Sequence, residues 1–432
     1  MRTFAAIQGR VTNTQAEVGR PMAKAGPRLL MNDNTTMSVA GPIALYVHIP
    51  FCETKCPYCD FNTYAGIEPL VPAYVAALRR EIELWGEALG RPTVATVFFG
   101  GGTPSYLPSR HIAALMASVR AGFELDGDAE VTLEANPGDF TDDKLAAYLA
   151  GGINRLSIGV QSLDDGLLKV LGRRHNAAEA ERAYRMAVAA GFDNVSIDLM
   201  YGLPYQHIDQ WRETLEGAES LGPQHISMYG LTLEGGTPLE RQVKTGVVPV
   251  PDPDLAADMY LMAEDAMARL GYRHYEISNW ALPGRESRHN LTYWENRPYL
   301  GVGPGAHSYL TGRRFWNLKS PKEYTRRLAP SLALHRDGAD LIVTMPAVGE
   351  VEVIDRRLEM AETMMMGLRL DTGVGVAGFA SRFGATPSEV YGEVIAEMED
   401  VGLLTAGDGA VALTPRGRLL GNEVFSRFVG IG

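Results

Sequence analysis

Cysteine is scarce in this sequence, and the few cysteines are clustered. Only three occur among 432 residues, and all of them, Cys52, Cys56 and Cys59, lie within one segment of eight residues. An odd number of cysteines excludes a framework in which every cysteine is paired in a disulfide. A chain that otherwise avoids cysteine is typical of a reducing compartment, where clustered thiols serve metal or cofactor sites.

Long apolar runs and an excess of basic residues are also missing. The most membrane-like uncharged stretch, 34–52, contains His48, Pro42 and Pro50. A spanning helix needs about 20 mostly apolar residues, so no transmembrane segment is predicted. The 52 acidic and 40 basic residues give a net charge of −12, which disfavours non-specific binding to polyanions. We therefore expect a cytoplasmic protein with no nucleic-acid partner.

The first forty residues differ from the rest of the chain. Basic side chains outnumber acidic ones there, and no apolar segment of the signal-peptide type is present. Met22, Met31 and Met37 are alternative start sites. We interpret 1–40 as a flexible tail or an artefact of the assigned start, with a transit peptide as the weaker alternative.

Six short apolar runs alternate with helix-like segments in the first half of the chain. This rhythm predicts βαβ units with a parallel sheet, and hence an α/β fold. The pattern alone fits an incomplete (β/α)6 barrel or an open doubly wound sheet. Strands are predicted over 43–49, 94–99, 130–135, 155–160, 195–201 and 225–231, and helices over 72–89, 109–121, 141–150, 175–190 and 208–220.

The pattern changes after residue 232. A helix is predicted over 254–270, and 288–310, which is rich in glycine, aromatic residues and histidine, is expected to be an ordered loop. Helices over 354–370, 386–405 and 418–428, with a hairpin over 407–417, predict a small α+β region like a winged helix. The predicted domains are the tail 1–40, a barrel core 41–240, a barrel extension 241–350 and a C-terminal domain 351–432.

The cysteines follow the first predicted strand with the spacing Cys-x3-Cys-x2-Cys. Thiolates this close can bind one soft metal centre. Three of them would leave one iron of a [4Fe–4S] cluster without a protein ligand, since such clusters usually have four cysteines. The open iron can chelate S-adenosylmethionine, whose cleavage would release a 5′-deoxyadenosyl radical. Structural zinc with His48 as a fourth ligand and three unrelated thiols are the alternatives.

Further polar or glycine-rich positions fall at the ends of other predicted strands or, for Asp198, within the fifth one. They are the segment GGGTP (100–104), Glu134, Gln161 and Asp198. In folds of this class the chemistry collects where strands end and loops begin. We therefore expect one shared site at the carboxyl edge of the sheet.

These segments resemble radical SAM proteins, and specifically the oxygen-independent coproporphyrinogen III oxidase family. The matching segments are, in order, YVHIPFCETKCPYCDF (46–61), GGGTPSYL, EANPG, SIGVQS, LGRRH and IDLMYGLP. The resemblance covers 43–425. It implies a partial (β/α)6 barrel whose [4Fe–4S] cluster is bound by Cys52, Cys56 and Cys59.

The resemblance also implies which residues bind S-adenosylmethionine. Glycines permit close backbone approach, and an arginine suits a carboxylate. By position, Tyr46 and Tyr58 would lie against the cofactor, and its methionine amine would meet Gly101, Gly102 and Thr103. Glu134 would balance a cationic part of the cofactor. Its carboxylate and ribose would be bound by Gln161, Arg173 and Asp198.

Two features favour the haem chaperone (HemW) branch of this family. The oxidases have a fourth cysteine two residues after the third, where this chain has Phe61. The chain also carries the HNxxYW element of the chaperone branch at 289–294. Because haem iron takes an axial imidazole, His289 is predicted to bind haem beside Tyr293 and Trp294, with His307 as a second candidate. A hydrogen-bonded loop histidine with two core aromatic residues is the alternative.

The resemblance thus implies a haem chaperone that holds a [4Fe–4S] cluster and S-adenosylmethionine. It would deliver haem, its cargo, to an apo-haemoprotein such as a respiratory membrane enzyme. The alternatives are oxygen-independent oxidation of coproporphyrinogen III to protoporphyrinogen IX and another radical SAM reaction such as methylation. Whether the protein is an enzyme stays open. A homodimer and a peripheral position at the inner membrane through a partner are further expectations.

Overall fold

The structure is a computed structural model that describes residue 39, residues 41–329 and residues 340–429. The predicted tail 1–40 lies outside these residues, apart from residue 39. The described residues form one unit by their internal contacts, to which all of their helices and strands belong. None of these helices has both the length and the apolar character needed to cross a membrane.

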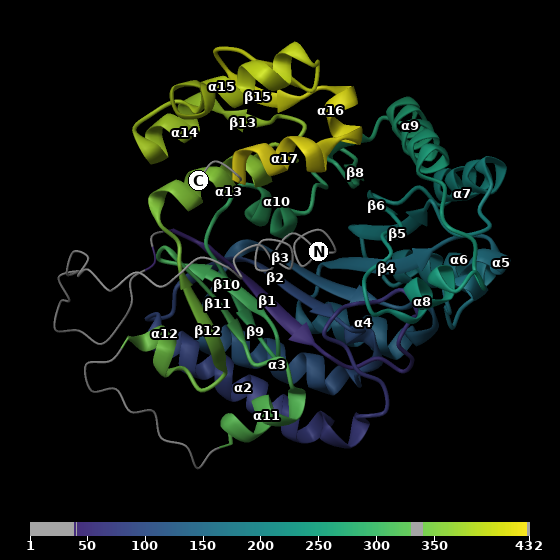
Figure 1. Ribbon diagram of the computed structural model, residues 1–432. Coiled ribbons are helices and arrows are strands. Elements are labelled where there is room, and N and C mark those ends of the chain that lie inside the picture. Colours follow the sequence, from purple (N-terminus) through teal and green to yellow (C-terminus); the bar gives the residue numbers. More distant parts are fainter. Residues whose placement is uncertain (1–38, 40, 330–339, 430–432) are drawn as a thin grey trace. The chain divides into compact units, whose positions relative to one another are not determined.

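Six parallel strands form the centre of a 12-stranded sheet (Figure 1). They lie in sequence order, and each pairs in parallel with the next. A doubly wound sheet reverses its strand order at a switch point, whereas this order never reverses, so the predicted partial (β/α)6 barrel is confirmed. The strands are β1 (Ile43–Ile49), β2 (Thr93–Gly101), β3 (Glu124–Ala135), β4 (Arg155–Gln161), β5 (Val195–Tyr201) and β6 (His225–Gly230).

Helices connect these strands and cover one face of the sheet. Every second strand side chain is apolar and packs in the core with these helices, as Leu45, Val47, Val97 and Phe99 do, because successive strand residues point to opposite faces. The other face, here called the inner face, carries the polar side chains. The connecting helices are α2 (Val71–Ala88), α3 (Ser109–Gly122), α4 (Asp142–Gly151), α6 (Ala177–Ala189) and α7 (Ile208–Leu221), each within two residues of its predicted bounds.

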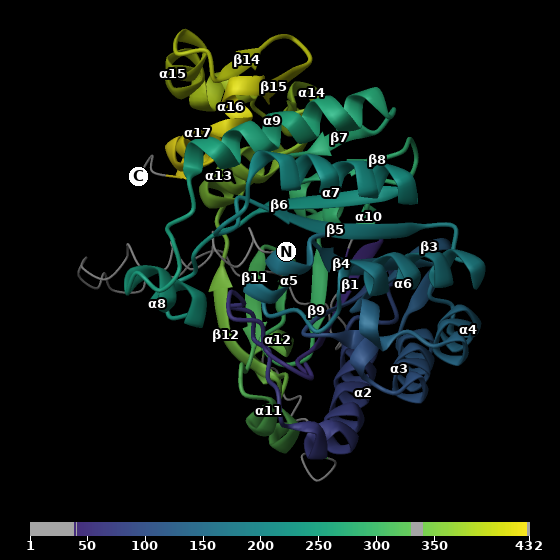
Figure 2. The same cartoon turned by 90° about the vertical axis from the view of Figure 1, so that its right-hand side faces the viewer.

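Shorter helices occupy several of the loops between these elements. They are η1 (Glu68–Leu70), η2 (Pro104–Tyr106), η3 (Pro137–Asp139), α5 (Asp165–Val170) and α8 (Pro238–Lys244). The longer α9 (Pro253–Arg269) agrees with the predicted helix 254–270. It packs against α7 beside β5, as Figure 2 shows.

The sheet continues beyond the six parallel strands on both sides, which the sequence did not predict. Next to β1 lies β9 (Tyr299–Val302), in parallel pairing, followed by the antiparallel β10 (His307–Leu310), β11 (Arg313–Asn317) and β12 (Val348–Val353). At the other edge, β8 (Asn279–Ala281) pairs antiparallel with β6, and β7 (Arg273–Glu276) follows. The helices α11 (Pro321–Arg327) and α12 (Leu341–Thr344) lie between β11 and β12 in the chain.

The prediction that 288–310 is a loop is wrong. This segment forms α10 (Arg288–Trp294) and the strands β9 and β10. Both strands have only four residues, which is too short for a reliable periodicity. They form because they pair with β1 and β11, partners that no local pattern reveals. Figure 1 shows α10 on the inner face, opposite α2 and α3.

The C-terminal region has a core of its own and a winged-helix-like order of elements, as predicted. Its three-stranded sheet has the order β13-β15-β14, and its core includes Met364, Phe379, Phe383, Ile395 and Phe428. The elements are α13 (Arg356–Gly367), β13 (Val374–Gly375), α14 (Val376–Phe383), α15 (Pro387–Asp400), β14 (Leu404–Ala406), β15 (Ala410–Leu413), α16 (Pro415–Leu419) and α17 (Gly421–Val429).

The predicted bounds in this region need correction. The helix expected over 386–405 ends at Asp400, because Gly402 has a left-handed φ of 70° and 404–406 pairs with β15. The hairpin therefore begins earlier than predicted. The helix expected over 418–428 is two helices, since α16 ends at Leu419 and α17 begins at Gly421.

Candidate functional site

The three cysteines lie in the loop that follows β1, at the carboxyl edge of the parallel strands. The base of this loop is closed by two hydrogen bonds, from Cys52 N to Tyr64 O (2.9 Å) and from Tyr64 N to Pro50 O (2.8 Å). Within the loop, Cys59 N donates to Cys56 O (3.1 Å). All three thiols are free, with Cys52 buried and the other two partly exposed. The loop therefore presents three free thiols that could act as metal ligands.

Neighbouring side chains donate hydrogen bonds to the sulfur atoms. Thr103 Oγ1 donates to Cys52 Sγ (3.6 Å), and Arg173 Nη1 donates to Cys56 Sγ (3.5 Å). Burial raises the pKa of the Cys52 and Cys59 thiols. Without a bound cation these thiols stay protonated, whereas a coordinating metal deprotonates them. The donor set therefore fits a metal centre with thiolate ligands.

The alternative of a zinc site with His48 has no support in this geometry. Tyr46 Oη lies 3.0 Å from His48 Nδ1, and His48 Nε2 lies 3.0 Å from the carbonyl oxygen of Asn62. Both ring nitrogens are thus engaged. In the described part of the chain, no group of three or more Cys, His, Asp or Glu side chains is arranged to hold a single metal ion. Three thiols without a fourth ligand fit a cluster, in which separate irons bind separate thiolates, better than zinc.

The glycine-rich segment at the end of β2 lies directly against the cysteine loop. Thr103 N donates to Phe51 O (2.8 Å). A Cβ atom on Gly102 would lie 2.6 Å from Phe51 O and 3.0 Å from Cys52 Sγ. Gly101 has a φ of 115°, which disfavours any residue with a side chain. The close approach of the two loops therefore requires glycine at both positions.

Two carboxyl groups lie on the inner face next to this segment. Glu134 Oε2 accepts a hydrogen bond from Gly101 N (3.0 Å), and Asp198 Oδ1 accepts one from Ser157 Oγ (3.0 Å). Burial, and secondarily the negative charge of Asp198, raises the pKa of Glu134 to about 7. A cationic ligand placed between these carboxylates would relieve their repulsion and lower this pKa. The pair is suited to a positively charged group.

Gln161 and Arg173 converge above β4. Arg173 Nη2 donates to Gly159 O (2.8 Å). A Cβ atom on Gly159 would lie 2.9 Å from Gln161 Nε2 and 3.3 Å from Arg173 Nη2. Gln161 itself has a φ of 69°, a conformation that is uncommon outside glycine and concentrates at functional sites. The guanidinium thus reaches from β4 to the Cys56 sulfur.

The structure gathers most of the predicted site residues at one edge of the sheet. Tyr58 is buried in a cluster with Met200 and Leu203, which the partly buried Cys56 and Cys59 flank. Tyr46 lies on the inner face and is bonded to His48. Their roles toward a cofactor stay a prediction. Asp198 lies on the inner face in the middle of β5. The residues at the edge are Cys52, Cys56, Cys59, Tyr58, Gly101, Gly102, Thr103, Glu134, Gln161 and Arg173.

His289 lies apart from this edge, on α10. It is fully buried, with Nδ1 2.8 Å from Thr96 Oγ1 and Nε2 2.9 Å from Tyr293 Oη. The ring stacks on Phe98 with a centroid distance of 5.0 Å, and burial lowers its pKa to about 3. Coordination of haem iron by His289 would require one of its hydrogen bonds to break. Its predicted role as a haem ligand is untested by this arrangement.

Trp294 and His307, the other residues predicted to meet haem, differ in exposure. Trp294 is buried, and its ring lies 4.3 Å from the Arg369 guanidinium carbon. His307 is partly exposed at the first position of β10, where it stacks on Trp316. Of the predicted haem contacts, His307 is therefore the one that retains open surface.

Sequence reasoning missed Asn62, which joins the cysteine loop to the barrel extension. Asn62 Nδ2 donates to Pro304 O (2.9 Å) and to Lys319 O (2.8 Å). A Cβ atom on Gly305 would lie 2.6 Å from the same nitrogen. These partners are more than 240 positions away in the chain, so no local motif could identify them.

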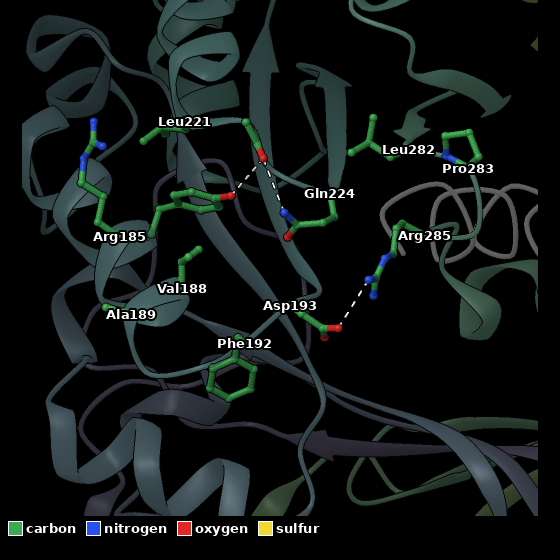
Figure 3. A pocket seen from close by; sticks show the side chains of 12 residues that line it. Arg185, Val188, Ala189, Phe192, Asp193, Leu221, Gln224, Leu282, Pro283 and Arg285 are labelled. Atoms are coloured by element: carbon green, nitrogen blue, oxygen red, sulfur yellow. Dashed lines mark hydrogen bonds and ion pairs between the residues drawn. The ribbon is translucent and has the colours of Figure 1, made fainter.

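A separate pocket, whose lining side chains are drawn in Figure 3, lies away from the cysteine loop. Asp193 and Gln224 line it and come just before β5 and β6, so it opens at the amino ends of these strands. Across it, Tyr184 Oη donates to Gly222 O (3.1 Å), and Arg285 pairs with Asp193 (3.4 Å). The pocket therefore does not belong to the cysteine site.

The fold and the cysteine site are those of a radical SAM protein. The profile of the Radical SAM superfamily matches residues 46–218, and that of the HemN C-terminal domain matches 354–420. A Mycobacterium tuberculosis protein named heme chaperone HemW is 39% identical over 394 residues, which are 90% of this chain and 95% of that protein. One of the same name from Bacillus subtilis is 36% identical over 386 residues, 89% and 98% of the two chains. The chain belongs to this family, heme chaperone HemW.

A solved structure shows the same fold. Coproporphyrinogen III oxidase (HemN) from Escherichia coli superposes with a TM-score of 0.77 and 23% sequence identity, over 90% of both chains. Membership of the radical SAM superfamily implies a [4Fe–4S] cluster and S-adenosylmethionine as cofactors. The free thiols of Cys52, Cys56 and Cys59 fit that implication.

Proposed function

We propose that this chain is a haem chaperone of the radical SAM type, which binds haem and transfers it to an apo-haemoprotein. One observation carries the proposal, namely the identity of 36–39% over about nine-tenths of the chain to relatives named heme chaperone HemW. Phe61 supports it, because it stands where the oxidases carry a fourth cysteine.

In this proposal the carboxyl edge of the barrel is the cofactor site. Cys52, Cys56 and Cys59 would hold the cluster, with Cys52 buried and the other two partly exposed. A bound cluster supplies a reducing electron. Thr103 and Arg173 stabilise negative charge on the thiolates through their hydrogen bonds.

S-adenosylmethionine would occupy the inner face beside the thiols. Glu134 and Asp198 would balance its positive charge, and the raised pKa of Glu134 falls when that charge arrives. Gly101, Gly102 and Thr103 would meet its methionine amine, since a glycine backbone lets a ligand approach closely. Gln161 and Arg173 would bind its carboxylate, since a guanidinium forms paired hydrogen bonds with such a group. Tyr46 and Tyr58 would lie against the cofactor.

The partners follow from the chaperone activity. The recipient would be an apo-haemoprotein, such as a respiratory enzyme of the inner membrane, and the chain would reach the membrane through that partner. A homodimer belongs to the same proposal, and the cytoplasm is its proposed location.

A haem titration tests the proposal. Anaerobically reconstituted full-length protein is titrated with haem, and the Soret band is followed against free haem. A saturable change that ends at one haem per chain supports the chaperone. Absence of saturable binding at micromolar protein contradicts it. In parallel, the same preparation is incubated with coproporphyrinogen III and S-adenosylmethionine, where formation of protoporphyrinogen IX would favour the oxidase instead.

A further inference from the structure

His307 lies at the same edge of the sheet as the cysteine loop. Because β9 runs parallel to β1, both strands end at this edge, and the turn 303–306 brings His307 to the start of β10 there. Leu310 of β10 packs in the core with the connecting helices. By the alternation of strand side chains, His307 and Tyr309 therefore point to the inner face.

Three further histidines, His48, His225 and His289, lie on or against this face, and their hydrogen bonding differs from that of His307. Both ring nitrogens of each are engaged by protein atoms. In His307, Nδ1 is buried without a partner, and no hydrogen bond to Nε2 is formed by any described residue. Among these four histidines, His307 is therefore the one whose Nε2 forms no hydrogen bond with a described residue and can bind a ligand without breaking one.

The surroundings of His307 match haem in shape and charge. Trp316 lies directly across the β10–β11 pair and stacks on the imidazole at 5.4 Å and 28°. Burial, with the positive charges of Arg314 and Lys319, lowers the pKa of His307 to about 4. The ring is thus neutral near pH 7, the form that binds metals. Lys319 is exposed and offers a cation to an anionic propionate.

The turn that carries His307 is firmly held. Gly303 N donates to Glu81 Oε2 (2.8 Å), and Asn317 Nδ2 donates to Gly303 O (2.9 Å). Pro304 O accepts the hydrogen bond from Asn62 of the cysteine loop. The histidine is therefore positioned before any ligand arrives, which lowers the ordering cost of binding.

We propose that His307, through Nε2, is the axial ligand of haem iron, with Trp316 packed beside the macrocycle at the mouth of the barrel. The inference rests on the proposed function, because it names the ligand for the cargo of that function. It places haem beside the cysteine loop, joined to it through Asn62, and leaves His289 as a buried residue that positions α10.

The test compares the ligation spectra of wild-type and variant proteins loaded with ferric haem. Full-length reconstituted wild type, His307→Ala and His307→Met are titrated, and absorption and electron paramagnetic resonance spectra are recorded. Wild type should show an imidazole-ligated iron, and both variants should lose that signature. In His307→Ala, loss of the ligand should weaken binding by about tenfold or more, which corresponds to about 1.4 kcal/mol. The thioether of His307→Met can itself ligate haem iron, so that variant is judged by loss of the imidazole signature alone. Free imidazole added to His307→Ala should restore the signature.

Two further variants separate ligation from packing. Trp316→Leu should weaken binding and leave the imidazole signature unchanged, because it removes only the stacked ring. His111→Ala, on α3, is the matched control and should behave as wild type. Far-UV circular dichroism and the cluster absorbance verify that each variant is folded, and His307→Met retains side-chain volume if the alanine variant does not fold.

The outcomes distinguish the two proposals. If His307→Ala and His307→Met keep the wild-type spectrum and affinity, His307 is not the ligand, while the chaperone proposal stands. If His289→Ala alone removes the imidazole signature from folded protein, the ligand is His289 and the inference is overturned. If the wild type itself binds no haem, the proposed function fails, and this inference fails with it.

Discussion

At the residue scale, a buried carboxyl group secures the turn behind His307. Glu81 on α2 is 1% exposed, and its carboxyl oxygens accept hydrogen bonds from Gly303 N, from Asn317 Nδ2 (2.6 Å) and from Tyr324 Oη (2.5 Å). All these partners are uncharged. Burial raises the pKa of Glu81 to about 7, although the hydrogen bonds oppose the shift. Proton binding at this residue is therefore linked to folding.

The linkage predicts how Glu81→Gln changes the pH dependence of stability. An unfolded chain ionises Glu81 near pH 4.5, whereas the folded chain keeps the proton until about pH 7. Between these values the folded state binds more protons, so the free energy of unfolding falls as pH rises. Glutamine cannot titrate and accepts fewer hydrogen bonds. The free energy of unfolding of Glu81→Gln should therefore lie furthest below that of the wild type at low pH. This difference should shrink by about 3 kcal/mol at most as the pH rises to 7.

Urea unfolding at pH 5, 6, 7 and 8 measures this effect. Tyr74 and Tyr324 flank the carboxyl group and stay neutral throughout, because burial raises their pKa well above 10. Glu83→Gln on the same helix is the control, since Glu83 is half-exposed in a surface pair with Arg80. A deficit of Glu81→Gln that is constant or grows with pH would contradict the linkage.

At the element scale, two strand ends determine the cysteine site. The loop after β1 and the segment after β2 meet at Gly102, where a Cβ atom would collide with Phe51 O and contact Cys52 Sγ. Atoms of the main chain cannot move aside without displacing the loop. The site is therefore sensitive to a single added methyl group.

Gly102→Ala should impair cluster assembly more than it impairs folding. Overpacking of this kind typically costs about 1–3 kcal/mol, and here the strain falls on the loop that holds Cys52. We expect less iron and sulfide per chain after anaerobic reconstitution, with unchanged far-UV circular dichroism. Gly127→Ala is the control, because nothing lies within 4 Å of its Cβ position. Equal iron content in both variants would show that the loop tolerates the methyl group.

Elements with local signatures were predictable from the sequence, and elements with distant partners were not. The strands β1 to β6 and their helices show clear periodicity, and the cysteine spacing and GGGTP segment identify the site. By contrast, β9 is stabilised by pairing with β1, and its four residues carry too little pattern. The role of Asn62 could not be predicted either, because its hydrogen-bond partners lie far away in the chain. The enclosure of His289 could not be foreseen either, because Thr96 and Phe98 reach it from β2.

At the scale of the whole described unit, buried ion pairs attach the C-terminal region to the barrel. Arg369 Nη2 lies 3.2 Å from Glu276 Oε2, with side chains 4% and 0% exposed. Arg314 forms two hydrogen bonds to Glu362, at 2.6 and 2.7 Å. The helix α10 contacts α13 on one side and β2 on the other. The HNxxYW element therefore forms part of this junction.

Arg369→Met should loosen the junction while leaving both cores intact. Removing one partner of a buried ion pair typically costs about 3–5 kcal/mol, because the other charge remains buried. We expect the C-terminal region to unfold at lower temperature than the barrel, as a separate calorimetric transition. Arg427→Met, which breaks an exposed pair with Glu397, is the control. The double variant with Glu276→Gln should recover part of the loss, and a single unshifted transition in Arg369→Met would contradict the prediction.

The pairing of β1 with β9 has a consequence for synthesis on the ribosome. About 250 residues separate the end of β1 at Ile49 from the start of β9 at Tyr299. At about 5–20 residues per second, translation leaves one edge of β1 without its partner for roughly 10–50 s. The hydrogen bonds from Asn62 to Pro304 O and Lys319 O likewise cannot form until those residues have been synthesised. The cysteine loop therefore gains its contacts with the barrel extension only when most of the chain has been made.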